Sequence, residues 1–419
     1  MPPQPRLAVT DGPTERAVPP RVPPQNTEPP PQAAPPGTVL PGPTARKRWN
    51  RAARASGFPL AVYGATLLLH LAMLAVMNPP GGPGVRDRLL SWDGQWFVAI
   101  ARAGYSHDSA FTADGLSGGD LAFFPAYPFL VRAVHAMTGL DHRSAALVVS
   151  HLALTVALLC VHRLLLDLYG RRTARIALVL LACAQPMALV FLMAYSESLF
   201  LALASAALLA VHRRAWLTAG VLVLLAGLTR PVAVALVAAL AVAVVLRLRG
   251  TGRMSWRPPA ALVLASCGTP AYLVWVDRRT GRPGTWFAIQ EAGWGTRWDN
   301  GATFVDFLVK TLTRGDGWVP VSTALLVLAL LAGTMAAWCD EIWPPLAVYG
   351  TVIVITALGQ SNFYHSKLRL LTIALVFLIP AARALARART GTAVATLTAA
   401  ALFGSWYGAY MLTTWRYAI

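Results

Sequence analysis

The sequence predicts an all-α membrane protein, a polytopic bundle of about eleven transmembrane helices with further helices in its extracytoplasmic loops. Two observations support this prediction. Of the 419 residues, 56% are hydrophobic and only 13% are charged, which is too apolar a composition for one water-soluble core. The apolar residues also occur in long blocks, as membrane spans require.

The N-terminal residues 1–45 are predicted to be a disordered, proline-rich cytoplasmic tail, followed by a membrane domain over 46–419. The tail holds 15 of the 31 prolines and almost no periodic apolar residues, so it cannot bury enough surface to offset its ordering entropy. The first apolar block begins near Phe58, after the basic run RKRWNRAARAS. It lies too far into the sequence for a cleaved signal peptide, so we expect an anchor with a cytoplasmic N-terminus.

The charges of the short connections set the expected orientation. The expected spans are 58–78, 144–166, 174–194, 197–212, 215–229, 231–248, 258–277, 318–338, 342–359, 368–386 and 391–413. With the N-terminus inside, most arginines of the short connections fall in the cytoplasm, in agreement with the positive-inside rule. Most carboxylates then lie outside, chiefly in two long loops, 79–143 and 278–317. The polar chemistry is therefore expected at the extracytoplasmic face of the cell membrane.

The stretch 91–132 in the first long loop is the main candidate for a functional site. It reads SWDGQWFVAIARAGY and, after a polar interval, DLAFFPAYPFLVR. Trp92, Trp96 and Ile100 recur every fourth residue with Phe97 beside them, so we expect an amphipathic helix that presents these residues to a lipid interface. Asp93 opens this helix, either as a helix cap or as a general base for a buried acceptor hydroxyl.

The second long loop interleaves tryptophans with polar side chains and glycines. Trp286, Trp294 and Trp298 occur here with Gln290 and Glu291. Aromatic rings beside polar side chains can stack on sugar faces. The alternative for each tryptophan is membership of an interfacial belt.

Four motifs give the sequence a family resemblance. They are WDGQWFVAIARAGY, AFFPAYPFLVR, YSESLF and, near the C-terminus, NFYHSKLRLLTIALVFLIP. Together they resemble the PIG-V-like mannosyltransferases, a family of GT-C glycosyltransferases. The resemblance implies a GT-C-type fold, a mannosyl phosphoryl polyprenol as donor, and Asp93 as the general base. The last motif departs from the family pattern, because Lys367 stands where a proline-containing S-x-P-R-like run is more typical.

The first three motifs supply candidate substrate-binding residues. Their aromatic candidates are Trp92, Trp96, Phe124, Tyr127 and Tyr195. Glu197 is a further candidate, since the resemblance suggests a carboxylate that faces the cavity of Asp93 and holds acceptor hydroxyls or tunes the pKa of the base. Its alternative role is to stabilise a helix N-terminus through the helix dipole.

Cations near the outer membrane surface are candidates for contact with a lipid phosphate. Arg230, Lys367 and Arg369 fall there, and His365 precedes the last two as a possible donor. Such a cation is needed because negative charge grows on the polyprenyl phosphate as it leaves. The alternative for each is snorkelling to lipid headgroups.

No metal or cofactor is predicted. Cys160, Cys183, Cys267 and Cys339 stand without a CxxC pair or a histidine at ligand spacing, so neither disulfides nor zinc are expected. The sequence has no Walker loop, no GxGxxG after a strand and no DxD pair, which argues against a nucleotide-sugar site. The net charge is +18, but the sequence has no basic face interleaved with aromatic residues. A nucleic-acid partner is therefore not predicted.

These observations lead to one main functional hypothesis. A membrane glycosyltransferase moves mannose from a polyprenyl-phosphate-linked donor to a lipid, glycan or protein acceptor at the extracytoplasmic face. A transporter or flippase is the alternative, although no internal repeat is found, and a scaffold with a degenerate site is a third possibility. Convergence of the 91–132 helix and the tryptophan-rich loop on one cavity containing Asp93 favours the transferase.

Overall fold

The computed structural model describes residues 45–106, 111–112, 115–116, 119–251, 255–315 and 317–417. The chain divides into two units, Met1–Asn50 and Arg51–Ile419, and the fold described below belongs to the second. The predicted disordered tail, 1–45, lies outside the described residues except for its last position.

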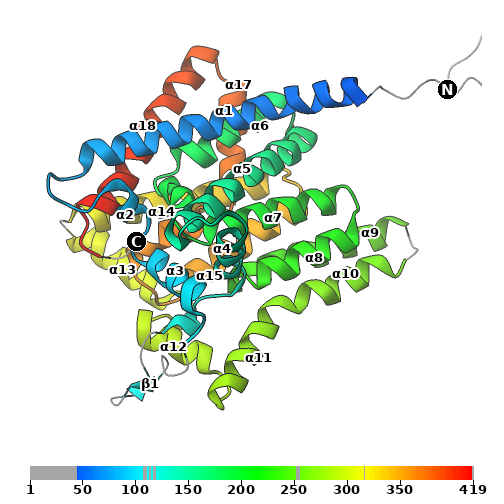
Figure 1. The fold of residues 1–419 in the computed structure, drawn as a ribbon. Helices are drawn as coiled ribbons and strands as arrows, with labels where there is room; N and C mark the ends of the chain where they lie inside the picture. The colour runs from blue at the N-terminus through cyan, green and yellow to red at the C-terminus, as the bar shows by residue number, and fades with distance from the viewer. Residues whose placement is uncertain are drawn as a thin grey trace, which may run out of the picture. The chain divides into compact units, whose positions relative to one another are not determined.

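The described residues are almost entirely helical, and the first helix begins before Arg51 (Figure 1). The α-helices are α1 (Ala45–Met77), α2 (Val85–Leu89), α3 (Asp93–Ala103), α4 (Ala126–Thr138), α5 (His142–Tyr169), α6 (Arg171–Val179), α7 (Glu197–His212), α8 (Trp216–Gly227), α9 (Val234–Thr251), α10 (Arg257–Ser266), α11 (Gly268–Thr280), α12 (Thr285–Trp294), α13 (Ala302–Arg314), α14 (Trp318–Cys339), α15 (Pro344–Leu358), α16 (Lys367–Leu371), α17 (Leu378–Arg387) and α18 (Thr390–Thr413). The short segments are the π-helical η2 (Leu180–Ala184) and the 3₁₀ turns η1 (Asp120–Ala122), η3 (Ala188–Leu192), η4 (Pro231–Ala233) and η5 (Tyr364–Ser366). Two short strands, β1 (Phe111–Thr112) and β2 (Gly115–Leu116), pair antiparallel.

Five segments of the described chain are long and apolar enough to cross a membrane. They are Ser56–Met77, His142–Tyr169, Pro231–Gly250, Arg257–Thr280 and Trp318–Cys339. Helices α7, α8 and α15 are apolar but shorter. The structure is thus the polytopic helical bundle that the composition predicted, and the count of about eleven spans stays a prediction.

The predicted span 174–194 is broken. Helix α6 gives way to the π-turn η2, and Gln185 then adopts an extended backbone with ψ 137°. The following Pro186 explains the break, because a proline disfavours helical geometry in the residue before it and has no N–H to donate. Helix α18 lies so close that a Cβ on Gly404 would be 2.5 Å from the carbonyl oxygen of Ala184. Only glycine admits this approach.

The predicted span 368–386 is also interrupted, since α16 and α17 are separate helices. The side chain of Gln185 donates to the carbonyl of Thr372 at 3.1 Å, and the hydroxyl of Tyr349 donates to that of Ile373 at 2.9 Å. These contacts satisfy carbonyls that the break leaves without helical partners.

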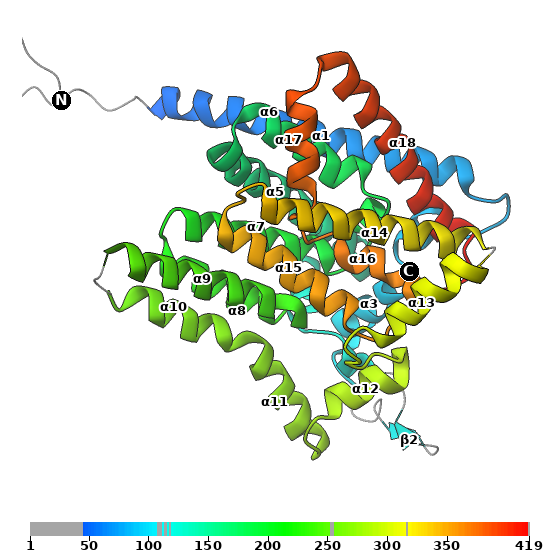
Figure 2. The ribbon, with the colours of Figure 1, turned by 180° about the vertical axis from the view of Figure 1, so that it is seen from behind.

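Helices α8, α9 and α10 lie side by side (Figure 2). Helix α8 approaches α10 and its continuation α11 at backbone distance. A Cβ on Gly220 would be 2.7 Å from the carbonyl oxygen of Ala261, and one on Gly268 would be 2.2 Å from that of Leu224. Small residues permit this close packing. Helices in lipid have no hydrophobic driving force to associate, so van der Waals contacts of this kind hold them together.

Connections predicted to be extracytoplasmic meet at one end of the unit. The guanidinium of Arg88 donates to the carbonyl of Leu412 at 2.9 Å. The N–H of Ala126 donates to the carbonyl of Leu228 at 2.9 Å. The first long loop is therefore held against the ends of α8 and α18.

Connections predicted to be cytoplasmic meet one another elsewhere. The N–H of Trp343 donates to the hydroxyl of Tyr169 at 3.1 Å, and Arg172 donates to the carbonyl of Ala388 at 2.7 Å. Each of these four contacts thus joins segments that are predicted to lie on the same side of the membrane. Which set faces the cytoplasm stays a prediction.

The helix predicted over the WDGQWF motif forms as α3, but its faces differ from the prediction. Phe97 and Ile100 are only 4% and 0% exposed, because they pack into a buried cluster with α4 and α5. Trp92 and Trp96 are 39% and 37% exposed. The prediction of one lipid-facing row is therefore wrong for Ile100 and Phe97. Trp92 precedes the helix with φ +56°, which breaks the fourfold spacing.

Candidate active site

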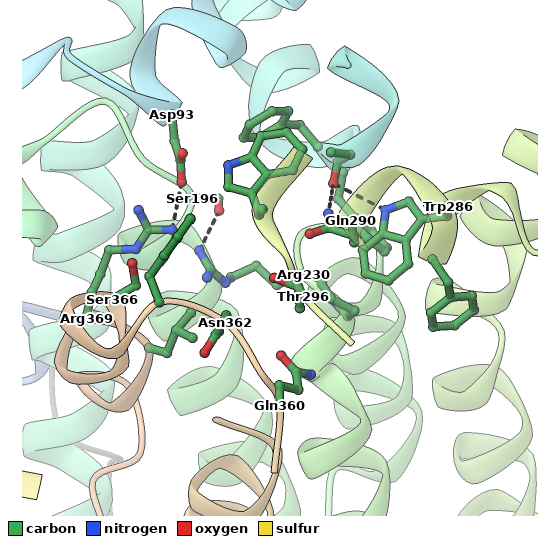
Figure 3. A pocket seen from close by; sticks show the side chains of 18 of the residues that line it. Asp93, Ser196, Arg230, Trp286, Gln290, Thr296, Gln360, Asn362, Ser366 and Arg369 are labelled. Atoms are coloured by element: carbon green, nitrogen blue, oxygen red, sulfur yellow. Dashed lines mark hydrogen bonds and ion pairs between the residues drawn. The ribbon is translucent and has the colours of Figure 1, made fainter. Parts of the chain in front are cut away.

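A cavity of about 490 Å³ lies where the two long loops meet (Figure 3). The first loop contributes Asp93, Phe97 and the segment after η1, whereas the second contributes α12 and the residues that follow it. Lining residues from these two sources include Asp93, Phe123, Trp286, Gln290, Trp294 and Trp298. The 91–132 helix and the tryptophan-rich loop therefore converge on one cavity that contains Asp93.

Charges alternate along one wall of this cavity. Arg369 Nη2 donates to Asp93 Oδ2 at 2.7 Å, and Arg369 Nε lies 3.1 Å from Glu197 Oε1. The second Glu197 oxygen, Oε2, lies 2.9 Å from Arg230 Nη1, which also donates to Ser196 Oγ at 3.0 Å. Two carboxylates thus balance two guanidiniums.

Burial strengthens these ion pairs. The side chain of Glu197 is 1% exposed, and those of Arg369, Arg230 and Asp93 are 11%, 14% and 18% exposed. Buried charges persist only when they are paired, and their attraction is stronger than in water. Glu197 lies behind the cavity, whereas the other three line it. Among the described residues no group of three or more His, Cys, Asp or Glu could hold a metal ion.

The starts of α3 and α7 hold the two carboxylates together. Asp93 is the first residue of α3 and Glu197 the first of α7, as predicted. The N–H of Ala194 donates to the carbonyl of Leu89 at 2.9 Å, and a Cβ on Gly94 would lie 3.5 Å from the Cβ of Ala194. Helix α3 therefore rests directly on the turn that leads into α7.

Tyr195 lies in that turn and supports Arg369 from behind. The guanidinium carbon of Arg369 is 5.0 Å from the centroid of the Tyr195 ring, which is cation–π distance. Tyr195 is itself fully buried. Substrate contact by Tyr195 stays a prediction.

The opposite wall is aromatic and amide-rich. The indole N–H of Trp286 and the amide of Gln290 each donate to the carbonyl of Ala122 at 3.2 Å (Figure 3). Trp298 forms an antiparallel bridge with Gln360. These contacts tie the tryptophan-rich loop to the first loop on one side and to the segment after α15 on the other.

The structure brings some predicted site residues to the cavity and not others. Asp93, Phe124, Arg230 and Arg369 line it. Trp96 stacks on the lining residue Phe123 with centroids 5.7 Å apart. The predicted residues that do not line the cavity are Trp92, Trp96, Tyr127, Tyr195, Glu197, His365 and Lys367.

Two of these residues lie in packed aromatic surroundings. The hydroxyl of Tyr127 donates to the carbonyl of Ala146 at 2.8 Å inside the cluster around α3. The ring of His365 stacks on Phe363 at 5.4 Å between centroids and is 6% exposed. Substrate contact by Tyr127 or His365 stays a prediction.

Lys367 and Arg369 project in different directions. The ammonium of Lys367 donates to the carbonyls of Ala357 at 2.9 Å and Gln360 at 2.5 Å, and the side chain is 1% exposed. Residues two apart on a helix are rotated by about 200°. Burial lowers the pKa of Lys367 to about 8, and the nearby carboxylate of Asp299 partly opposes this shift. Lys367 braces the segment that carries Gln360 into the cavity.

Several polar lining residues were not predicted. They are Ser196, Thr229, Thr296, Arg297, Gln360, Asn362 and Ser366. Ser196, Asn362 and Ser366 lie within the motifs that carry the resemblance, and Thr229 precedes Arg230. Thr296 and Arg297 lie in the tryptophan-rich loop, and Gln360 had no sequence signal of its own.

No protein-family model matches the sequence, and no curated protein sequence matches it. Solved structures do resemble its fold. ArnT from Cupriavidus metallidurans, bound to undecaprenyl phosphate, superposes with a TM-score of 0.51 at 15% identity, over 82% of this chain and 63% of ArnT. The fold is of the GT-C type. The apo form of the same ArnT gives 0.50 at 16% identity, again over 82% and 63%.

The archaeal oligosaccharyltransferase AglB from Archaeoglobus fulgidus superposes with a TM-score of 0.44 at 13% identity, over 85% of this chain and 56% of AglB. The chain thus spans less than two thirds of the length of either protein. Identities this low establish the architecture alone. The predicted GT-C-type helical fold is confirmed, and the PIG-V-like resemblance rests on the sequence motifs.

Proposed function

We propose that the protein is a membrane glycosyltransferase that moves mannose from a polyprenyl-phosphate-mannose donor to an acceptor at the extracytoplasmic face. The observation that carries the proposal is one cavity that holds a carboxylate, Asp93, beside two guanidiniums, Arg230 and Arg369. Such a transfer needs a base and an anion-binding group at the same place. Transporters usually place their polar sites at mid-membrane depth between repeated halves. A cavity at the junction of two loops favours the transferase.

In the proposed reaction Asp93 accepts the proton of an acceptor hydroxyl. The acceptor oxygen then attacks the anomeric carbon, and the bond from that carbon to the phosphate oxygen breaks. The electron pair of the broken bond remains on the polyprenyl phosphate, whose added negative charge Arg230 and Arg369 stabilise. A single displacement of this kind inverts the anomeric centre.

The aromatic wall of the cavity suits a sugar ring. Trp286, Trp294 and Trp298 offer flat apolar faces, while Gln290 and Asn362 offer donors and acceptors for hydroxyls. The choice of mannose rests on the motif resemblance. The lipid-linked donor gains support from the similarly folded ArnT, which was solved with undecaprenyl phosphate.

The orientation inferred from the short connections puts the cavity outside the cytoplasm. There the acceptor is a lipid glycan, a cell-wall polymer or a protein hydroxyl. The cytoplasmic tail, 1–45, takes no part in the transfer itself.

Membranes that contain the protein, incubated with labelled polyprenyl-phosphate sugars, test this proposal. We expect label from polyprenyl-phosphate-mannose to enter a product that membranes lacking the protein do not make. A glucosyl donor should give less product. Transfer from a nucleotide sugar alone, without any lipid-linked donor, would contradict the proposal.

A further inference from the structure

We infer that Glu197 is a positioning residue that holds Arg230 and Arg369 as a two-guanidinium clamp for the phosphate of the donor. The inference rests on the proposed function and deepens it. It gives Glu197 a role behind the cavity wall, in place of direct contact with acceptor hydroxyls.

The geometry of Glu197 carries this inference. Its carboxylate is 1% exposed and shares its two oxygens between the two arginines, with Oε1 at 3.1 Å from Arg369 Nε and Oε2 at 2.9 Å from Arg230 Nη1. Arg230 precedes η4 and Arg369 belongs to α16, so the two come from distant segments of the chain. One buried carboxylate therefore sets the separation of two cations that both line the cavity.

Each arginine has a second contact from the turn that precedes Glu197. Arg230 donates to Ser196 Oγ at 3.0 Å, and Arg369 lies over the ring of Tyr195 at 5.0 Å. Each residue of the YSE run in the YSESLF motif thus contacts at least one of the two guanidiniums. Planar guanidiniums held in this way suit the oxygens of a phosphate, which they bind through paired N–H groups.

The two carboxylates beside Arg369 act on phosphate binding in opposite senses. Asp93 accepts from Arg369 Nη2 at 2.7 Å and itself lines the cavity, so an incoming phosphate competes with it for that guanidinium. Glu197 lies behind and keeps its contact with Nε during the exchange. Removal of Asp93 therefore favours phosphate binding, and removal of Glu197 weakens it.

Binding of undecaprenyl phosphate to the purified full-length protein in detergent tests this difference, with undecaprenol as the uncharged control. Asp93→Asn and Glu197→Gln form a matched pair, because each removes one negative charge next to Arg369 and keeps the side-chain shape. We expect Asp93→Asn to bind undecaprenyl phosphate severalfold more tightly than the parent. Glu197→Gln should bind it roughly 10- to 150-fold more weakly. Undecaprenol binding should be the same in all three proteins.

The possible outcomes separate the inference from the proposed function. If Glu197 only balanced charge, both variants would bind undecaprenyl phosphate more tightly, which would overturn the inference and leave the proposed function intact. A parent protein with no preference for undecaprenyl phosphate over undecaprenol would overturn the proposed function, and the inference with it.

Ser196→Ala covers the case in which Glu197→Gln does not fold. This variant removes the hydroxyl that accepts from Arg230 and leaves every charge in place. Weaker undecaprenyl phosphate binding, with a raised donor KM and a smaller change in kcat, supports the clamp. Unchanged binding and an unchanged KM overturn it.

Discussion

Asp93 accepts a hydrogen bond of 2.7 Å from Arg369, which is 276 residues away in the sequence. The proposed base and a proposed phosphate ligand therefore neutralise each other in the absence of donor. A phosphate bound by Arg369 would compete with Asp93 Oδ2 for the same Nη2 group.

Arg369→Ala should lower kcat/KM for transfer by roughly 10- to 150-fold, because the loss of a charge-assisted contact costs about 1.5–3 kcal/mol. The matched control is Arg297→Ala. Arg297 also lines the cavity, but its side chain is 66% exposed and pairs with Glu291 at 3.4 Å. Such an exposed pair contributes about 0–1 kcal/mol. Equal losses in the two variants would mean that Arg369 has no special part in donor binding.

Gly359→Ala should raise the donor KM severalfold while the protein still inserts normally. A Cβ on Gly359 would be 2.4 Å from the indole of Trp298, so the ring has to shift out of its place in the cavity wall. Overpacking of this kind costs about 1–3 kcal/mol. The φ of −75° at Gly359 is allowed for alanine, but a Cβ there would also lie 2.8 Å from the carbonyl oxygen of Ile355, so the end of α15 has to adjust as well.

Gly391→Ala is the control for this substitution, since a Cβ there meets nothing within 4 Å. Its kinetics should match those of the parent. A Gly359→Ala protein with parental KM would show that the position of Trp298 does not matter for donor binding.

The pH dependence of stability tests the burial of Lys367. Burial lowers the pKa of Lys367 from 10.5 to about 8 in the folded protein. Between these values the unfolded chain binds more protons than the folded one, so the free energy of unfolding rises as the pH increases through this range. Below the folded pKa both states are protonated and this contribution is constant.

Lys367→Met removes this titration. Thermal unfolding in detergent should show the Tm advantage of the parent over Lys367→Met growing between about pH 7.5 and about pH 10. A Tm difference that stays constant with pH would mean that the ammonium keeps its ordinary pKa.

Tags inserted in the connection at 250–257 should be cytoplasmic, and tags near Ser117 should be extracytoplasmic. The expectation follows from the arginines of the short connections. Labelling with a membrane-impermeant reagent in intact cells measures it. A cytoplasmic tag near Ser117 would remove the lipid-linked donor from the account, because the cavity would then open to the wrong side.

The sequence predicted the helix starts that carry the charges. Asp93 and Glu197 were each expected at the first residue of a helix, and both are found there. The two long loops were predicted to share one side of the membrane, and their convergence on one cavity was the observation named to separate a transferase from a transporter. The periodicity of apolar residues and the residues that start helices suffice to predict where a helix begins.

The sequence did not indicate which charged side chains of the site form ion pairs with each other. Nothing in the spacing of Asp93 and Arg369 indicates that they meet, since the contact depends on how α16 breaks away from the predicted span 368–386. The same break decides that Lys367 faces backbone carbonyls while Arg369 faces the cavity. The rotation of about 200° between residues two apart on a helix could have predicted that Lys367 and Arg369 point in different directions. It could not have predicted which of them lines the cavity.

Asp93→Asn tests the central claim most directly. Asparagine keeps the shape of the side chain and can still accept from Arg369 through its amide oxygen, so an Asp93 that only holds Arg369 predicts a moderate loss of transfer and not its abolition. A missing general base costs roughly 10²–10⁴ in rate. We would measure mannosyl transfer from a polyprenyl-phosphate donor in membranes matched for protein amount, with Asp87→Asn and Asp120→Asn as controls from the same loop. The account predicts that Asp93→Asn abolishes transfer and that Asp87→Asn retains it; parental activity in Asp93→Asn would contradict the assignment of the base.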